Sequence, residues 1–296
     1  PLPPGCVGPE SQMAGKASSC AGCPNQAKCA SGKGAEPDPA VKEAFEGVKH
    51  TILVLSGKGG VGKSTIASQI AWGLADAKKE VGVLDIDICG PSMPRMMGVE
   101  NEEVHRSGSG WRSVPVMMMM MMMMMMMLTN CQFWNENRNE PHCHLLTRSS
   151  YFVLVALHQT AFQMNLTDYL VVDAPPGTSD EHISIAKLLK KVKIDGAVIV
   201  TTPQEVALLD VRKEISFCRK TKIPILGVVE NMSSFSCPNC GFKTSIFPPI
   251  SGGARQMCKE MGVQYLGRSV PMDSKLLEAC EKGVSFLSTY PGAPAA

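Results

Sequence analysis

The chain has 296 residues, of which 29 are basic and 27 acidic, so its formal net charge is only +2. This balance argues against a general nucleic-acid binder, because such domains are usually strongly basic. Apolar residues make up 44% of the chain, which is enough to bury a core. The longest apolar stretch, 114–128, is shorter than the ~20 residues that cross a bilayer, and no basic-then-apolar secretory signal opens the sequence. We therefore expect neither a nucleic-acid nor a membrane partner.

Residues 1–48 form a flexible tail in this interpretation, because seven prolines and six glycines fall within positions 1–40. The tail carries four cysteines, Cys6, Cys20, Cys23 and Cys29, spaced C-x13-C-x2-C-x5-C. Twelve cysteines without a secretory signal favour metal ligation or redox chemistry in a reducing compartment over disulfides. Four thiolates suit a cubane iron–sulfur cluster or zinc. A zinc ribbon would normally offer two C-x-x-C pairs, and only one is present, so iron–sulfur is favoured.

From residue 49 to 290 the sequence alternates strand, turn and helix. Short apolar runs at 51–56, 81–86, 169–172, 197–201 and 225–229 are typical of strands buried on both faces. Helical patterns follow at 183–192 and 206–218. The alternation predicts an α/β fold with a mainly parallel sheet covered by helices. Residues 291–296 are expected to be a disordered end.

A glycine-rich turn after the first strand matches the phosphate-binding loop G-x-x-x-x-G-K-S. Its glycines let backbone N–H groups point at phosphate oxygens, and the following helix adds its positive end. Lys63 is expected to contact the β- and γ-phosphates of ATP, and the Ser64 hydroxyl to bind Mg²⁺. The residues expected to surround the nucleotide are Gly57, Gly59, Gly60, Val61, Gly62, Lys63, Ser64 and Thr65.

Three further positions could complete this site. Asp173 ends a predicted strand, where a carboxylate is well placed for Mg²⁺. Asp85 and Asp87 end another strand, and one of them could orient the attacking water. Lys58, which the plain motif does not require, is either a solvated side chain or a charge that reaches the nucleotide of a partner subunit.

The segment 117–167 does not fit the pattern. It begins with eleven consecutive methionines, and identical flexible side chains cannot specify one packed arrangement. We expect this block to be foreign to the fold, as a translated repeat, a retained intron or a gene-model error would be.

The pair Cys237 and Cys240 forms a second C-x-x-C motif, and it is incomplete as a metal site. Two ligands cannot close a tetrahedral thiolate site, but a two-fold symmetric dimer would bring four thiolates together. A thioredoxin-like redox pair and a partial zinc knuckle are the alternatives.

Together these motifs resemble the Mrp/NBP-type P-loop ATPases, of the deviant Walker A class related to bacterial partitioning ATPases. The strings that carry the resemblance lie at 57–65, 84–92, 173–180, 229–233 and 237–240, with the N-terminal cysteine quartet. The resemblance covers about residues 5–116 and 168–290. It implies a P-loop NTPase fold and an ATP-dependent cytosolic scaffold that assembles [4Fe-4S] clusters and transfers them to apoproteins.

The resemblance also assigns roles. It implies a stable cluster on the N-terminal quartet and a labile one bridged by Cys237 and Cys240 between subunits. Lys58 resembles the family's trans-acting lysine, Asp87 its catalytic aspartate and Asn231 its adenine contact. The implied partners are a second copy, a paralogue without the N-terminal cysteines in a heterotetramer, apo iron–sulfur proteins and downstream assembly factors. A partitioning-type ATPase with structural zinc, or a defective product of an aberrant gene model, are the alternatives.

Overall fold

The computed structural model describes residues 13, 15–23, 26–30, 47–87, 92–100, 167–177, 194–237, 240, 242–248, 251–267 and 269–296. At 106–107, 110–111, 114–116 and 119–122 it describes the backbone alone. Contacts divide the chain into two units, Pro1–Pro39 and Ala40–Ala296. The first unit contains the 3-10 helix η1 (Ser18–Cys20) and the helix α1 (Gln26–Ala30).

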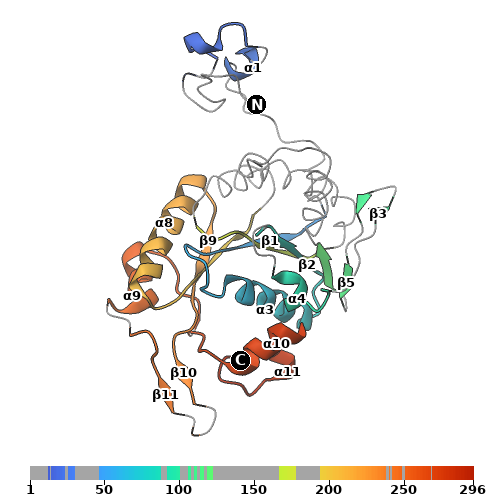
Figure 1. Ribbon diagram of the computed structural model, residues 1–296, viewed down its shortest axis with the longest axis vertical. Helices are drawn as coiled ribbons and strands as arrows, with labels where there is room; N and C mark the ends of the chain where they lie inside the picture. The colour runs from blue at the N-terminus through green and yellow to red at the C-terminus, as the bar shows by residue number, and fades with distance from the viewer. Residues whose placement is uncertain are drawn as a thin grey trace, which may run out of the picture. The chain divides into compact units, whose positions relative to one another are not determined.

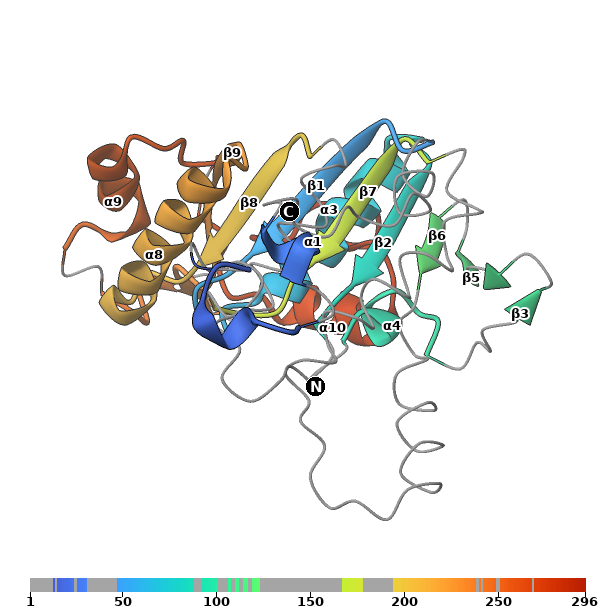
Figure 2. The same cartoon turned by 90° about the horizontal axis from the view of Figure 1, so that it is seen from above.

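The second unit is built on a seven-stranded sheet of order β5-β6-β2-β7-β1-β8-β9, seen edge to edge in Figure 2. Every pair from β6 to β9 is parallel, and β5 alone pairs antiparallel with its neighbour β6. The strands are β1 (His50–Leu55), β2 (Val81–Asp85), β5 (Val114–Val116), β6 (Met119–Met122), β7 (Tyr169–Asp173), β8 (Gly196–Thr201) and β9 (Ile225–Glu230). All five strands expected from the apolar runs are present, which confirms the predicted mainly parallel sheet.

Helices cover both faces of the sheet (Figures 1 and 2). One face is covered by α8, with α9 beside it, and the other by α3 and the small helices that pack against α3. The helices are α3 (Lys63–Asp76), α4 (Met93–Met96), α8 (Glu205–Thr221), α9 (Gly253–Met261), α10 (Ser274–Lys282) and α11 (Phe286–Thr289). Two short antiparallel ribbons complete the described elements, β3 (Arg106–Ser107) with β4 (Gly110–Trp111) and β10 (Phe235–Ser236) with β11 (Lys243–Thr244).

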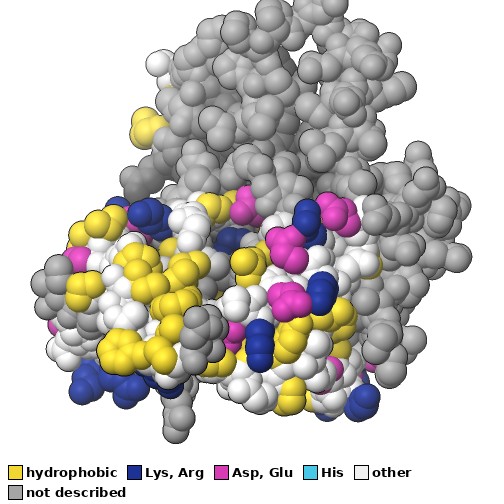
Figure 3. Space-filling model, turned by 60° about the horizontal axis from the view of Figure 1, so that its bottom comes forward, with side chains coloured by type: hydrophobic (Ala, Val, Ile, Leu, Met, Phe, Trp, Pro, Cys, Tyr) yellow, Lys and Arg dark blue, Asp and Glu magenta, His cyan; other side chains and the backbone are white. Residues whose placement is uncertain are grey.

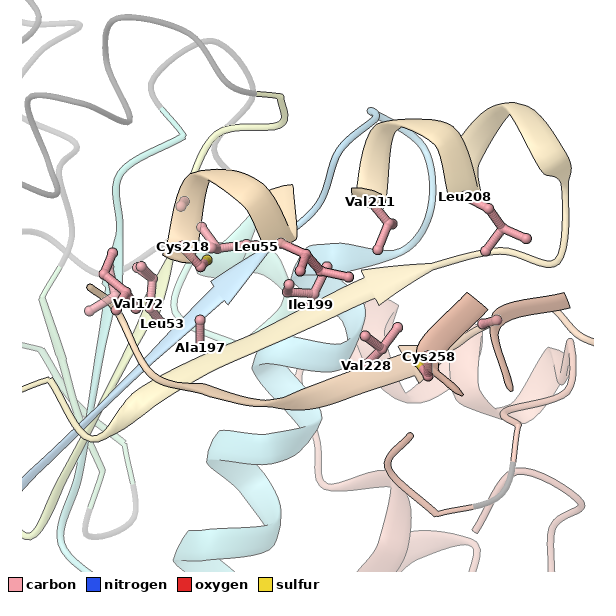
Figure 4. Packing of buried hydrophobic residues seen from close by; sticks show 14 of the residues in the cluster. Leu53, Leu55, Val172, Ala197, Ile199, Leu208, Val211, Cys218, Val228 and Cys258 are labelled. Carbon is pink, nitrogen blue, oxygen red and sulfur yellow. The ribbon is translucent and has the colours of Figure 1, made fainter. Parts of the chain in front are cut away.

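The alternation of side chains along the strands produces two cores. Leu53 and Leu55 of β1 point to the face that α8 covers, where they pack with Leu208, Val211 and Cys218 (Figure 4). Val54, between them in sequence, points to the opposite face and belongs to the cluster with Ile66, Ala67, Ala71 and Trp72 of α3. Burial on both faces explains why these strands read as continuous apolar runs, and each fully buried leucine contributes about 2 kcal/mol to folding. The sheet is therefore a rigid base for the loops at its carboxyl edge.

Two regions differ from the sequence-based expectation. The segment 117–167 was expected to stand apart from the fold, but Met119–Met122 pairs with β2 from Val81 to Leu84. Parallel pairing uses only backbone N–H and C=O groups, so identical side chains do not prevent it. Residues 123–166 lie outside the described part of the chain.

The end of the chain, 291–296, was expected to be disordered, but it is folded against α10. Ala293 is 8% exposed and belongs to a small core with Leu276, Cys280 and Phe286. The backbone N–H of Ala295 donates to Asp273 at 3.3 Å. The expected helix at 183–192 lies outside the described residues, and within those residues every helix is too short or too polar to span a bilayer.

Candidate functional site

The phosphate-binding loop lies between the end of β1 and the start of α3, at the carboxyl edge of the sheet. Gly60 and Gly62 have φ of +79° and +82°, the left-handed conformation that favours glycine. Gly62 is also the N-cap of α3, whose first turn contains no acidic residue and has no side-chain cap. The N–H groups at this helix end and the positive pole of its dipole are thus available to an anion.

Beside the loop is a cavity of about 210 Å³. Its lining comes from the loop, from the segments after β2 and β7, and from α4: Ser56, Lys58, Gly59, Gly60, Gly62, Lys63, Ser64, Thr65, Asp87, Ser92, Met96 and Pro176. Lys58 is exposed at this cavity. Sequence reasoning assigned no role to Ser92 or Pro176, although both lie in strings that carry the family resemblance, and no motif marks Met96.

Lys63, Ser64 and Asp173 form one hydrogen-bonded group beneath the loop. Lys63 Nζ donates to Asp173 Oδ1 at 2.6 Å, and Ser64 Oγ donates to Asp173 Oδ2 at 2.6 Å. Asp87 Oδ2 lies 3.8 Å from Lys63 Nζ. The structure therefore brings together the four residues that the sequence placed around the phosphates and Mg²⁺. Two carboxylates, a hydroxyl and an ammonium at this spacing can hold a nucleotide phosphate with its divalent cation.

Burial controls the charge of this group. Asp173 is fully buried, and loss of water raises its pKa, while the Lys63 ammonium and the two hydrogen bonds act in the opposite direction. Because Lys63 is itself only 7% exposed, the two charges hold each other in the absence of phosphate. A bound phosphate and cation would replace these partners, the phosphate for Lys63 and the cation for Asp173.

Asp85 and Asp87 have different environments, which distinguishes their roles. Asp85 is 4% exposed, and its two oxygens accept from the backbone N–H groups of Asp87 at 2.9 Å and Met93 at 3.3 Å. Burial, followed by the nearby Asp173, raises the pKa of Asp85 to about 7. Asp87 instead lines the cavity. Asp85 therefore holds the loop in place, and Asp87 is the aspartate that can reach a bound nucleotide.

Asn231, the expected adenine contact, follows β9 and touches the loop. Its side-chain Nδ2 donates to the carbonyl of Val61 at 3.0 Å, and its backbone N–H donates to Thr201 at 2.7 Å. A Cβ on Gly62 would lie 2.2 Å from this Nδ2 atom. Gly57 has the same kind of constraint, since its Cβ would lie 2.6 Å from the backbone of Asp210 in α8. The phosphate-binding loop is thus fixed from two sides by neighbouring elements.

The pair Cys237 and Cys240 lies on the β10–β11 ribbon, which projects from the body of the unit in Figure 1. Cys237 is half-buried and Cys240 is exposed. The backbone N–H of Cys237 donates to the carbonyl of Phe242 at 2.9 Å, which closes the loop between the two strands. Both cysteines therefore lie in the segment that joins β10 to β11.

Exposed apolar side chains accompany this hairpin. Phe242 is 70% exposed, and Phe235, Ile246 and Met272 are between 37% and 42% exposed. Figure 3, which brings the lower side of Figure 1 forward, shows hydrophobic side chains gathered on this face. A gathering of exposed apolar side chains is typical of a surface that a partner or ligand covers.

In the first unit, Cys20 and Cys23 lie one turn apart. Cys20 is 7% exposed, and the N–H of Cys23 donates to its carbonyl at 3.1 Å. Cys29 is in α1, its side chain lying outside the described part, as does the whole of Cys6. Within the described residues no group of three or more His, Cys, Asp or Glu side chains is arranged to hold a metal ion. The spacing of Cys20 and Cys23 is compatible with two thiolates on one centre.

Comparisons with known proteins decide the family. The family model described as "ParA: NUBPL iron-transfer P-loop NTPase" matches residues 47–296. The chain belongs to this family. The resemblance to the Mrp/NBP-type P-loop ATPases is thereby confirmed, and the chain is a nucleotide-binding P-loop NTPase of an iron-transfer family.

Solved structures agree with this assignment. The nucleotide-binding protein of Archaeoglobus fulgidus, solved in complex with ADP and with cobalt found in it, is 33% identical, with a TM-score of 0.65 over 84% of this chain and 92% of that one. The septum site-determining protein MinD of Pyrococcus horikoshii with Mg-ADP is 17% identical, with a TM-score of 0.57 over 84% and 91%. A ParA family ATPase of Chlorobium tepidum is 16% identical, with a TM-score of 0.51 over 84% and 95%. The last two show the fold alone.

Proposed function

We propose that this protein is an ATP-dependent scaffold that assembles [4Fe-4S] clusters in the cytosol and transfers them to apoproteins. Its family is one of iron-transfer P-loop NTPases. The observation that carries the proposal is that one unit combines the phosphate-binding loop with two thiols on a projecting hairpin. Thiolates are the ligands that iron–sulfur clusters use.

The nucleotide chemistry follows from the positions of the site residues. Lys63 would leave Asp173 for the β- and γ-phosphates of ATP, while Ser64 and Asp173 would hold Mg²⁺, which neutralises charge on the phosphates. Asp87, at the cavity wall, would accept a hydrogen bond from the attacking water and orient it. Hydrolysis then gives ADP and inorganic phosphate. Lys58 would act on the nucleotide of a second copy, as expected for a deviant Walker A loop.

The cluster carried to apoproteins is the cargo of this activity. Each chain offers two thiolates at the hairpin, Cys237 and Cys240, and two chains would offer the four that a cubane cluster requires. The exposed Phe242 beside them would be covered in such a dimer. The quartet Cys6, Cys20, Cys23 and Cys29 would hold a second, stable cluster within the chain. A homodimer, or a heterotetramer with a paralogue lacking that quartet, would be the working assembly, and downstream assembly factors and apo iron–sulfur proteins would receive its clusters.

The test is anaerobic reconstitution with iron and sulfide, followed by assays of iron and acid-labile sulfide per chain. We expect the double variant C237S/C240S to lose the chelator-labile iron and to lose iron-dependent dimerisation. The variant C258A, which removes a buried thiol of α9, is the matched control and should keep both. Stoichiometric zinc without acid-labile sulfide would contradict the proposal.

A further inference from the structure

Glu230 and Asn231 lie at the end of β9, where Asn231 contacts the phosphate-binding loop and Glu230 contacts the start of α9. Asn231 is 4% exposed and donates its side-chain amide to the carbonyl of Val61. The next residue, Met232, has a left-handed φ of 56°, and its Cε atom would lie 3.7 Å from a Cβ on Gly62. A change in the position of the loop on nucleotide binding must therefore move Asn231 or break its contact.

From Asn231 the chain reaches Cys237 along a bonded path. Both the backbone N–H and the hydroxyl of Ser233 donate to the carbonyl of Val270, at 3.0 and 3.1 Å. The N–H of Met272 donates to the carbonyl of Ser234 at 2.7 Å, and Phe235 forms a bridge with Met272. After the bend at Met232, the segment is thus held by hydrogen bonds to Val270 and Met272 as far as β10, which leads directly into Cys237.

The return limb of the same hairpin ends at the same two residues. After β11 the chain enters α9, and the N–H of Ala254 in its first turn donates to Glu230 Oε2 at 2.8 Å. Just before α9, the hydroxyl of Ser251 donates to the carboxylate of Glu205 at the start of α8. The Glu230 carbonyl also accepts from Val270 at 2.8 Å. Glu230 and Asn231 therefore join the phosphate-binding loop to both limbs of the cysteine hairpin.

We propose that Glu230 and Asn231 are positioning residues through which nucleotide bound at the loop restrains the Cys237–Cys240 hairpin. The inference rests on the proposed function for the identity of the hairpin as a cargo site. Bound nucleotide holds the phosphate-binding loop in one position, and the loop in turn holds Asn231. The two limbs of the hairpin then move less, so the thiols of Cys237 and Cys240 become less reactive. Because coupling between two binding sites is reciprocal, any factor by which nucleotide changes the metal affinity of the hairpin is also the factor by which metal bound there changes the nucleotide affinity.

The experiment measures the alkylation rates of Cys237 and Cys240 by iodoacetamide in the reduced, metal-free full-length protein, with peptide mass spectrometry as the readout. Each variant is compared without nucleotide and with Mg-ADP at a concentration that titration shows to be saturating. In the unmodified protein we expect Mg-ADP to slow both rates by at least about 5-fold, the lower end of typical site-to-site coupling. In N231A and E230A we expect the effect to fall below about 2-fold, since the link is cut at one residue or the other.

Three further variants separate the link from general loosening. E230Q keeps an acceptor for Ala254 and should retain the effect. S245A removes an exposed hydroxyl contact with Phe247 on the return limb and should also retain it. S233G/S234G leaves the contact of Asn231 with the loop in place but makes the segment between Asn231 and β10 flexible, so this variant should lose the effect of Mg-ADP. It tests the link even if N231A binds nucleotide too weakly to be saturated.

Equal alkylation rates with and without Mg-ADP in the unmodified protein would overturn the inference. An undiminished effect in both N231A and S233G/S234G would overturn it as well, because coupling would then use another path. No iron or sulfide enters this assay. If Mg-ADP slows alkylation of the thiols but cluster reconstitution fails, the link is supported and the proposed function is contradicted. If reconstitution succeeds but Mg-ADP does not change the alkylation rates, the proposed function is supported and the link is contradicted.

Discussion

Replacing Glu214 with glutamine should remove a pH dependence from the stability of the Ala40–Ala296 unit. Glu214 lies in α8 on the side that faces the sheet, where it is 0% exposed. Neither of its carboxylate oxygens has a hydrogen-bond partner within the described part of the chain. Burial, with a smaller contribution from Asp210, raises its pKa from the ordinary 4.5 to about 8.

The sign and size of the effect follow from proton linkage. Between about pH 4.5 and 8 the folded protein keeps the Glu214 proton and the unfolded chain releases it, so stability falls as pH rises. One proton per molecule corresponds to about 1.4 kcal/mol per pH unit, or roughly 2 kcal/mol between pH 5.5 and 7. Below the unfolded pKa the contribution is fully present, and above about pH 8 it is lost.

The assay is urea denaturation of the metal-free protein at several pH values in that window. The difference in unfolding free energy between the unmodified protein and E214Q should change by roughly 2 kcal/mol from pH 5.5 to 7, with the unmodified protein losing stability relative to the variant. E260Q is the control, because Glu260 is paired with Arg212 and its pKa lies below the ordinary value, outside the window. A difference between unmodified protein and E214Q that is the same at every pH would refute the reasoning.

Three other substitutions test the site and its support. G62A should lower both the stability and the ADP affinity more than G60A does, by at least about 1 kcal/mol in each, as measured by a thermal melt and an ADP titration. Both glycines have a left-handed φ, but only Gly62 lies against a neighbouring amide, that of Asn231. G283A should lower the melting temperature more than G262A does. A Cβ at Gly283 would lie 2.1 Å from the backbone nitrogen of Gly98, just after α4, whereas a Cβ at Gly262 would have no heavy atom of its surroundings within 4 Å. D85N removes one of two acceptors that hold the loop after β2, and steady-state kinetics should show kcat reduced on the order of 10-fold with ADP affinity nearly unchanged.

The fold could be predicted because its strands are buried on both faces. Each of the five apolar runs has β-branched or aliphatic residues at successive positions, and the structure distributes them between two cores, as Leu53 and Val54 show. The short edge strands could not be predicted, because nothing in a run of identical methionines selects Met119–Met122 for pairing with β2. Backbone hydrogen bonding at an edge leaves no pattern in the side chains.

The centre of the site was predictable for a related reason. Asp173 ends one strand of the parallel sheet, and Asp87 and Lys63 follow two others, and the carboxyl ends of such strands meet at one edge. Their assembly follows from topology, so the sequence order of strands and glycine-rich turn was sufficient. It could not separate the roles of Asp85 and Asp87, since that depends on which of the two carboxylates finds backbone donors.

Contacts to carbonyl groups are what sequence reasoning cannot see. The motif predicted Asn231 only as a contact for the adenine of the nucleotide, whereas in the structure its side-chain amide donates a hydrogen bond to the carbonyl of Val61. Every residue carries a carbonyl and a backbone N–H group, so these partners leave no trace in the sequence. Glu230 lies in the same motif, but the motif does not show that its carboxylate accepts from the N-terminus of α9. In the proposed coupling these bonds connect the nucleotide site to the thiols, because a segment that is hydrogen-bonded at several points transmits a displacement that a flexible loop would absorb. Coupling in this fold is therefore expected to reside in the ordinary-looking residues between the motifs, which is where substitutions should separate nucleotide binding from thiol reactivity.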